Sequence, residues 1–222
     1  MDHILDNEIA EQVRGALAGL QEPVRILYFG SEEACASCAE TKQLLEEVSA
    51  LDERIELKAY DIQRDQEIAR EFNVSDAPSI FVATRDAAGG DDASLHFQGL
   101  PSGYEFSTLI NDILMASRGD SGLNEQTRSF LRNISQPLLL QVFVTPSCPY
   151  CPRAVLLAHQ MAMENPRMIQ AQGVEAQEFP ELAMRFNVQG VPQTVINSGA
   201  GIVVGAVPEQ NLLAAIKQAL QN

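Results

Sequence analysis

The sequence predicts an α/β protein made of two similar units in tandem, each of which joins a strand to a helix through a Cys-x-x-Cys pair. The first pair is Cys35 and Cys38 and the second is Cys148 and Cys151, and these pairs contain all four cysteines of the chain. In both places an apolar run typical of a strand precedes the pair and helical sequence follows it. The first cysteines of the pairs are 148 − 35 = 113 residues apart.

Prolines repeat with nearly the same spacing. Pro78 and Pro192 each open an apolar strand-like run and are 192 − 78 = 114 residues apart, and Pro23 and Pro137 precede the first strands at 137 − 23 = 114. A common period at unrelated landmarks indicates an internal duplication.

The repeat spacing predicts two domains, residues 1–119 with the first cysteine pair and residues 120–222 with the second. Between them, Ser117 to Gly122 is a small polar segment of the kind that links domains. Because this linker is short, we expect the two units to pack together.

Both repeats are expected to have the same order of elements, with an extra helix ahead of the first strand. Apolar residues spaced three or four apart predict that helix, as at Ile9, Val13 and Leu17. The first repeat is predicted as helix 7–20, strand 24–29, helix 39–51, strand 55–61, helix 65–72, strands 79–83 and 95–98, and helix 104–117. The second is predicted as helix 124–134, strand 138–144, helix 152–162, strand 168–171, helix 180–186, strands 194–196 and 202–204, and helix 209–220. Residues 85–93, rich in Gly, Asp and Ala, are interpreted as a solvated hairpin loop, with partner docking as the alternative.

Two cysteines with two residues between them at a helix start suit dithiol–disulfide exchange. One sulfur must be exposed and ionised, and the partial positive charge of a helix N-terminus stabilises a thiolate there. We expect Cys35 and Cys148 to face solvent at or before the helix N-cap and to be the attacking sulfurs. Cys38 and Cys151 are then the resolving thiols.

The order strand, Cys-x-x-Cys, helix, strand, helix and X-Pro-strand resembles the thioredoxin fold. Two such units in tandem resemble the protein disulfide oxidoreductase family, glutaredoxin-like proteins first known from thermophilic archaea and bacteria. The segment from Gly99 to Phe106 is similar to that family's Gly-Leu-Pro-Ala-Gly stretch, and Cys148-Pro149-Tyr150-Cys151 has the dipeptide typical of glutaredoxins. The resemblance covers essentially the whole chain and implies two three-layer α/β/α units.

The same resemblance implies a substrate-binding role for the residues around two X-Pro bonds, Ala77-Pro78 and Val191-Pro192. If these bonds are cis, the residue before each proline presents its N–H and C=O groups to a peptide that binds as an added strand. The alternative is a pair of trans prolines that only begin edge strands.

The proton acceptor of thioredoxins does not carry over to this chain. Thioredoxins have a buried Asp six residues before the first cysteine, where this sequence has Phe29 and Val142. Asp61, Glu175 and Glu178 are candidates for the role, against the alternative that each is a solvated surface carboxylate.

The two sites are expected to differ in activity. Pro149 stiffens the second turn, and its dipeptide matches glutaredoxins, whereas acidic Glu32 and Glu33 precede the first pair. We therefore predict that the pair Cys148 and Cys151 is the more active one.

Metal binding is the main alternative, because two Cys-x-x-Cys pairs could supply the four ligands of a zinc site or bind an iron–sulfur cluster. Structural zinc pairs usually lie about 15 to 20 residues apart, whereas 148 − 38 − 1 = 109 residues separate these pairs. No metal is therefore expected, and His3, His96 and His159 are interpreted as isolated surface or half-buried residues. A non-catalytic interaction protein with inherited pairs is a further alternative.

Composition limits the partners. A formal net charge of −15 disfavours a nucleic acid or an anionic membrane surface as a partner. The first residues lack a basic segment followed by an apolar one, and no run of about 18 apolar residues occurs. With every cysteine in a Cys-x-x-Cys pair, these features favour a cytoplasmic, soluble protein.

The predicted function is therefore protein dithiol–disulfide oxidoreduction, which reduces protein disulfides and by resemblance also forms or isomerises them. No Gly-x-Gly-x-x-Gly or phosphate loop occurs, so no flavin or nicotinamide cofactor is expected. Electrons must then come from a partner, and an NADPH-dependent thioredoxin reductase is the expected donor.

Overall fold

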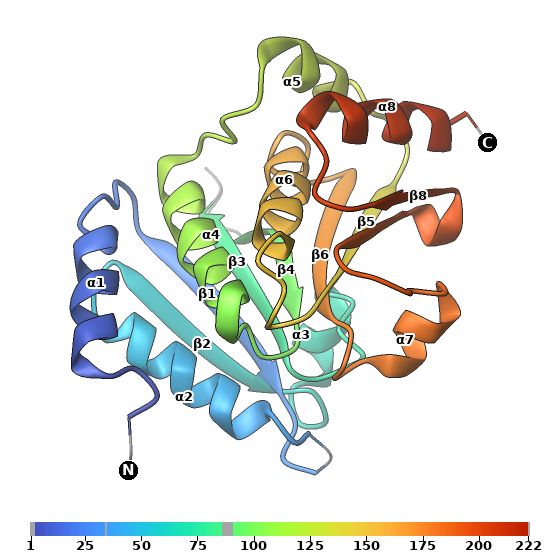
Figure 1. The fold of residues 1–222 in the computed structure, drawn as a ribbon. Coiled ribbons are helices and arrows are strands. Elements are labelled where there is room, and N and C mark those ends of the chain that lie inside the picture. Colours follow the sequence, from blue (N-terminus) through green and yellow to red (C-terminus); the bar gives the residue numbers. More distant parts are fainter. Residues whose placement is uncertain (1–2, 34, 86–90, 222) are drawn as a thin grey trace. The chain divides into compact units, whose positions relative to one another are not determined.

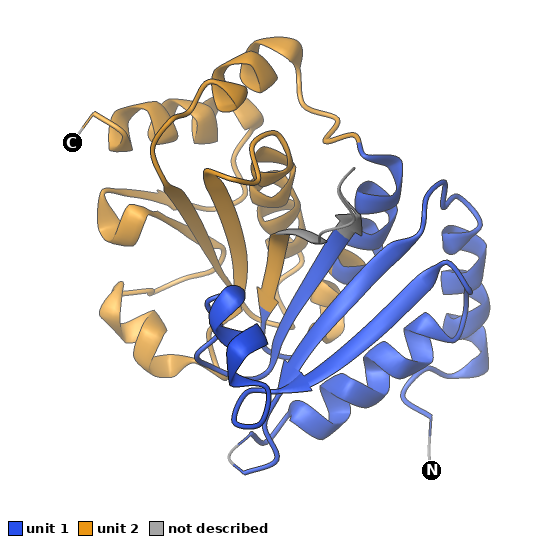
Figure 2. Ribbon diagram, turned by 180° about the vertical axis from the view of Figure 1, so that it is seen from behind, with its two compact units in different colours: residues 1–93, 98–100, 109–119 blue, residues 94–97, 101–108, 120–222 orange. Residues whose placement is uncertain are grey.

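The computed structural model of the chain describes residues 3–33, 35–85 and 91–221. Contacts between Cα atoms divide the chain into two compact units (Figure 2). Unit 1 comprises residues 1–93, 98–100 and 109–119, and unit 2 comprises residues 94–97, 101–108 and 120–222.

The first repeat has a mixed sheet (Figure 1). Its elements are α1 (Asn7–Leu17), β1 (Val24–Gly30), α2 (Cys38–Ser49), β2 (Ile55–Asp61), α3 (Gln66–Glu71), β3 (Ser79–Arg85), β4 (Asp91–Gln98), the 3-10 helix η1 (Gly103–Glu105) and α4 (Phe106–Arg118). The strands follow the order β2-β1-β3-β4. β1 runs parallel to β2 and antiparallel to β3, so α2 is the crossover between two parallel strands.

The second repeat has the same arrangement. Its elements are α5 (Glu125–Arg132), β5 (Leu138–Val144), α6 (Cys151–Met163), β6 (Ile169–Glu175), α7 (Pro180–Arg185), β7 (Gln193–Ile196), η2 (Asn197–Gly199), β8 (Gly201–Val204) and α8 (Glu209–Ala219). The strand order is β6-β5-β7-β8, with β5 parallel to β6 and antiparallel to β7. The predicted fold class is confirmed.

Two segments differ most from the prediction, beyond smaller differences such as that of α1, which ends at Leu17 and not at residue 20. β3 continues to Arg85 and β4 begins at Asp91, so the ends of the segment expected to be a loop, 85–93, belong to strands. Residues 86–90 of that segment lie outside the described residues. β6 continues to Glu175, beyond the predicted end at Ala171, because Gln172 and Gly173 interrupt its apolar pattern but not its backbone pairing with β5.

The extra helix that begins each repeat is present and has a side-chain cap. The Asp6 carboxylate accepts a hydrogen bond from the Ile9 N–H group (2.8 Å) at the start of α1, and Asn124 caps Thr127 of α5 in the same way (2.9 Å). Such caps satisfy backbone donors that a helix start leaves without partners.

Each sheet has apolar side chains on both faces, as a three-layer arrangement requires. On the face near α3, Phe29 of β1 packs edge-on against Phe81 of β3, with ring centroids 5.7 Å apart. Its repeat counterpart Phe143 contacts Phe186 beside α7, at 5.9 Å. Alternation along a strand directs the intervening residues to the opposite face, where α6 covers the second sheet.

None of the helices in the described ranges has both the length and the apolar composition that crossing a membrane requires.

Gly103 is in close contact with the loop that leads to the second cysteine pair. Its φ angle is +58°, and a Cβ atom there would overlap the carbonyl oxygen of Pro146. The next residue, Tyr104, donates its N–H group to that same carbonyl (3.0 Å). A residue without a side chain is therefore required at position 103.

We predict that Gly103→Ala destabilises the protein more than Gly119→Ala does. Gly119 has a similar φ angle, +64°, but no atom within 4 Å of its Cβ position, so its substitution adds backbone strain of about 1–2 kcal/mol alone. The overlap with Pro146 adds about 1–3 kcal/mol at position 103. Urea unfolding of the two variants measures the difference, and equal losses of unfolding free energy would contradict the close contact.

Candidate active site

The first cysteine pair lies between the end of β1 and the start of α2. Cys35 and Cys38 form a disulfide, with Cα atoms 5.4 Å apart, and α2 begins at Cys38. Cys35 is partly exposed and Cys38 is buried. The placement of both sulfurs at a helix N-terminus agrees with the prediction.

Backbone and side-chain groups at the end of β1 hold Cys38 in place. The Ser31 N–H group donates to the Cys38 Sγ atom (3.4 Å), and the Tyr28 hydroxyl donates to the Cys38 carbonyl oxygen (2.8 Å). A donor at the sulfur favours its thiolate form once the disulfide is opened. Gly30 makes this arrangement possible, because a Cβ atom at position 30 would overlap the Tyr28 hydroxyl.

Both cysteines of this pair line a cleft of about 500 Å³ in unit 1. Tyr28, Lys42 and Asp61 are among the other lining residues. The cleft therefore brings the first disulfide together with a phenol, an ammonium group and a carboxylate.

Asp61, at the end of β2, is an ionised turn-capping carboxylate. Its Oδ1 atom accepts hydrogen bonds from the N–H groups of Gln63 (2.9 Å) and Arg64 (3.0 Å), and its Oδ2 atom accepts one from Glu32 (3.2 Å). Burial opposes ionisation, but these hydrogen bonds and the charge of Arg64 hold the pKa of Asp61 below its usual value. Of the three candidate proton acceptors, Asp61 is thus poorly suited to hold a proton near neutral pH.

Tyr28 is a site residue that the sequence analysis missed. In the sheet, Tyr28 pairs with Ile80 and Val142 pairs with Thr194. Val142 follows Tyr28 by 142 − 28 = 114 residues, and Thr194 follows Ile80 by 194 − 80 = 114 residues. Tyr28, and not Phe29, is therefore the counterpart of Val142, because the loop before Cys35 contains one more residue than the loop before Cys148. Burial, and then the charge of Asp61, raise the pKa of Tyr28 to about 12.

The second cysteine pair occupies the equivalent place in the second repeat. Cys148 and Cys151 form a disulfide, with Cα atoms 5.5 Å apart, and α6 begins at Cys151. Cys148 is only 8% exposed and Cys151 is fully buried. The expectation that Cys148 faces solvent is therefore wrong for this disulfide form, because its side chain belongs to the apolar cluster under α6.

Glu175, at the end of β6, is the repeat counterpart of Asp61, 175 − 61 = 114 residues away. Its side chain is 2% exposed, and the Glu178 N–H group donates to its Oε2 atom (2.6 Å). Burial raises the pKa of Glu175 above its usual value, and the neighbouring charge of Glu178 acts in the same direction. The interpretation of Glu175 as a solvated surface carboxylate is therefore wrong.

The bonds Ala77-Pro78 and Val191-Pro192 are both cis, as the resemblance implied. The carbonyl groups of the two prolines accept hydrogen bonds from Gly99 (2.9 Å) and Gly205 (2.8 Å). Val191 is partly buried and packs against the apolar cluster that contains Cys148 and Cys151. Val191 also packs against the apolar cluster on the opposite face of the sheet, around Phe143.

The histidines lie outside the cysteine sites. His3 is exposed, and its Nδ1 atom lies 3.5 Å from the Glu47 Oε1 atom. His159 is fully buried, and its Nε2 atom lies 3.1 Å from the His96 carbonyl oxygen. The expectation of a surface or half-buried residue is thus wrong for His159. Burial and the charge of His159 lower the pKa of His96 to about 3.

A metal site is not supported. Each cysteine is bonded to its own pair partner, and no group of three or more His, Cys, Asp or Glu residues suited to a metal ion occurs in the described part of the chain.

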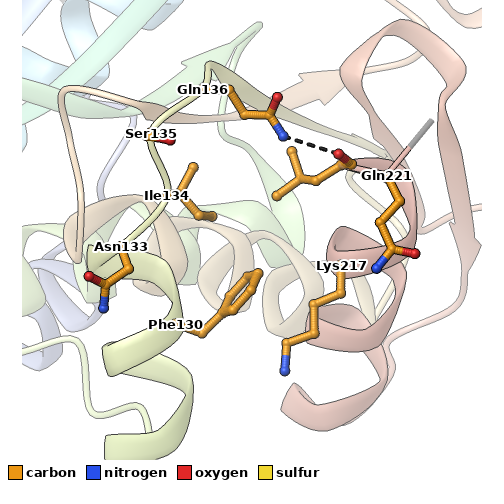
Figure 3. Close-up of a pocket in the computed structure, with 8 residues that line it drawn as sticks. Phe130, Asn133, Ile134, Ser135, Gln136, Lys217 and Gln221 are labelled. Atoms are coloured by element: carbon orange, nitrogen blue, oxygen red, sulfur yellow. Dashed lines mark hydrogen bonds between the residues drawn. The ribbon is translucent and has the colours of Figure 1, made fainter.

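A further pocket of about 370 Å³ lies between α5 and α8 (Figure 3). The Lys217 Nζ atom lies 4.7 Å from the centre of the Phe130 ring, and Gln136 donates to the Leu220 carbonyl oxygen (3.1 Å). Its lining residues include no cysteine, so we do not assign it to the redox chemistry.

Comparison with known proteins identifies the family. Residues 138–218 match the family model described as thioredoxin domain. The crystal structure of a protein disulfide oxidoreductase from Aeropyrum pernix K1 superposes on 99% of this chain and 96% of its own, with a TM-score of 0.89 and 30% sequence identity. The chain belongs to the protein disulfide oxidoreductases.

Two curated relatives are similar to this oxidoreductase over different lengths of the chain. The thioredoxin of Methanocaldococcus jannaschii is 32% identical over 81 residues, which are 94% of that protein and 36% of this chain. The F component of the alkyl hydroperoxide reductase of Xanthomonas campestris pv. phaseoli is 26% identical over 194 residues, 87% of this chain. The chain spans only about a third (33%) of the length of that component.

We predict that the Tyr28→Phe variant loses less free energy of unfolding at alkaline pH than the parent protein does. An unfolded tyrosine ionises near pH 10, whereas Tyr28 in the fold ionises at about 12. Its contribution to stability is therefore fully present below about pH 10 and is lost as the pH rises towards about 12. Urea unfolding of the disulfide form between about pH 9 and about pH 12 measures the slope.

The matched control is Tyr104→Phe, which removes a hydroxyl from a side chain that is 53% exposed. It should retain the parent's pH dependence. Identical alkaline slopes for the parent and both variants would contradict the role of burial at Tyr28.

Proposed function

We propose that this oxidoreductase exchanges dithiol for disulfide with protein substrates at both of its cysteine pairs. The observation that supports the proposal is the repeated placement of a disulfide at a helix start, in a chain that aligns over its whole length with a protein disulfide oxidoreductase. Reduction is the proposed main direction, with formation and isomerisation as reactions of the same sites.

In the reducing direction, the thiolate of Cys148 or Cys35 attacks one sulfur of a substrate disulfide. The substrate S–S bond breaks, and the other substrate sulfur leaves as a thiolate that takes up a proton. The resolving thiol, Cys151 or Cys38, then loses its proton and attacks the mixed disulfide. The second substrate sulfur leaves as a thiol, and the pair becomes a disulfide after giving two electrons to the substrate.

The attacking sulfurs are assigned by position. Cys35 and Cys148 lie just ahead of the first helical residue, where helix N–H groups and partial positive charge lower a thiol pKa. Cys38 and Cys151 begin the helices and are the more buried sulfur of each pair, as suits a resolving thiol.

An NADPH-dependent thioredoxin reductase is the proposed electron donor, since the exchange itself requires a partner that reduces the disulfides again. We place the protein in the cytoplasm, because every cysteine belongs to a Cys-x-x-Cys pair and none remains for a structural framework.

Substrate peptides are proposed to bind at Ala77-Pro78 and Val191-Pro192 as a short added strand. The packing of Val191 against the cluster that contains Cys148 and Cys151 supports the second of these positions.

A second candidate function is electron delivery in alkyl hydroperoxide reduction. The observation that favours it is the match of 87% of this chain to the F component of an alkyl hydroperoxide reductase. Extracts of a strain that lacks the gene for this protein should then consume alkyl hydroperoxide more slowly than extracts of the parent strain. Adding the protein in its dithiol form should restore the rate. Adding a variant in which all four cysteines are replaced by serine should not.

We predict that Cys148→Ser abolishes most of the insulin-reducing activity with dithiothreitol as reductant, and that Cys35→Ser causes a smaller loss. The reason is the glutaredoxin-like dipeptide between Cys148 and Cys151. The double variant Cys35→Ser/Cys148→Ser gives the background rate of dithiothreitol. Equal losses would contradict the ranking, and full activity in the double variant would contradict the proposed function.

We also predict that a trapped substrate peptide protects the backbone amide of Val191 from hydrogen exchange. The Cys151→Ser variant retains the mixed disulfide between Cys148 and a cysteine-containing peptide, because no resolving thiol remains. Amide exchange by nuclear magnetic resonance should then slow by about tenfold or more at Val191 if the amide is hydrogen-bonded. An unchanged rate at Val191 would remove the proposed strand-like binding, and a peptide that lacks the cysteine is the control.

A further inference from the structure

Glu175 lies at the edge of the second sheet where the cysteine loop begins. It is the last residue of β6 and pairs in register with Val144, the last residue of β5. Because β5 and β6 are parallel, the C-terminal ends of both strands and the N-terminus of the crossover helix α6 lie at the same edge. Cys151 is the first residue of α6.

The Glu175 side chain points to the face of the sheet that α6 covers. Along β6, Ile169 and Ala171 belong to the apolar cluster that contains Cys151, whereas Val174 belongs to the cluster on the opposite face. A Cβ atom at Gly173 would lie 3.2 Å from Val155 of α6. Since side chains alternate along a strand, Glu175 shares the face of residues 169, 171 and 173.

The carboxyl group is buried there with one oxygen unsatisfied. Glu175 is 2% exposed, and its Oε2 atom accepts the Glu178 N–H group. Within the described residues, its Oε1 atom has no hydrogen-bond partner. A buried carboxylate oxygen without a donor is costly, and a proton on the carboxyl group removes that cost.

Asp61, the counterpart of Glu175 in the first repeat, is held in its ionised form. Three backbone N–H groups hold Asp61 as a carboxylate, and its pKa lies below the usual value. Burial raises the pKa of Glu175. Of these two counterparts, Glu175 is the one whose surroundings favour the protonated form.

We propose that Glu175 accepts the proton of the Cys151 thiol when that sulfur attacks a mixed disulfide at Cys148. The inference rests on the proposed thiol exchange and assigns its proton acceptor at the second site. The Cys151 S–H bond breaks, its electron pair forms the bond to the Cys148 sulfur, and the substrate sulfur leaves with the electron pair of the mixed disulfide. Glu175 holds the proton and returns it to the leaving thiolate or to solvent.

Other ionisable groups belong to the elements around this carboxyl group. They are Cys151, Arg153 and His159 on α6, Cys148 and Tyr150 on the loop after β5, Glu178 on the turn after β6, and Tyr104 and Glu105 of η1, which contacts α6. Glu105 is itself 1% exposed, and the Thr108 hydroxyl donates to its Oε2 atom (2.7 Å). It is the carboxyl group from which the test must distinguish Glu175.

The experiment measures the resolving step alone, in the full chain with Cys35→Ser and Cys38→Ser as the parent. The dithiol protein reacts with Ellman's reagent to form a thionitrobenzoate mixed disulfide, and Cys151 then releases the second thionitrobenzoate. Stopped-flow absorbance follows this release as a function of pH.

With Glu175→Gln we expect the release to slow by about 100-fold near neutral pH. The rate should approach that of the parent at alkaline pH, where the Cys151 thiol ionises without help. Glu178→Gln keeps the backbone hydrogen bond to Glu175 but removes a charge that raises the pKa of Glu175. The fall in release rate that accompanies protonation of Glu175 should therefore remain but occur at lower pH.

An unchanged profile in Glu175→Gln overturns the proposal, and so does a loss of equal size at every pH, which would show a structural role. The proposal is also overturned if Glu105→Gln slows the release near neutral pH while Glu175→Gln has the pH profile of the parent. That result would identify Glu105 as the proton acceptor. Circular dichroism and urea unfolding verify that each variant is folded. Insulin reduction by the unmodified chain tests the proposed function separately, because it persists if only the assignment of Glu175 is wrong.

Discussion

The chemistry of both sites depends on one backbone constraint, the crossover of a helix between two parallel strands. In each repeat the first strand ends, a short loop with a cysteine follows, and the helix begins at the second cysteine. The helix then runs back along the sheet, so the next parallel strand ends at the edge where the helix started. The backbone route therefore brings three chain segments to the edge of the sheet at which each disulfide forms.

This shared backbone holds different side chains in the two repeats. The first has Tyr28 and an ionised Asp61 beside a partly exposed Cys35. The second has Val142 in place of the tyrosine, a buried Glu175 in place of the aspartate, and a Cys148 that is only 8% exposed. The duplication thus conserves the route of the chain and varies the polarity around the sulfurs, which is the property that sets thiol reactivity.

Spacing and hydrophobic pattern were sufficient to predict the element order, the extra helices, and the position of the cysteines at helix starts. These features depend on local sequence and on a period of 113 to 114 residues that is visible in one chain. Burial was harder to predict, because it depends on which elements pack over a residue. Glu175 and His159 look like ordinary polar residues in the sequence, yet both are almost completely buried. Tyr28 was missed for another reason. The loop before Cys35 has one extra residue, so counting six residues back from Cys35 reaches Phe29 and not Tyr28. The pairing of the strands shows that Tyr28 is the counterpart of Val142.

The contact between Tyr28 and Gly30 restricts the order in which the first site can change over evolutionary time. A side chain at position 30 would occupy the space of the Tyr28 hydroxyl, whereas the second repeat has valine at both matching positions, 142 and 144. A lineage that converts the arrangement of the first repeat into that of the second must therefore shorten residue 28 before it enlarges residue 30. The reverse order passes through an intermediate with two groups in the same volume, beneath the first turn of α2.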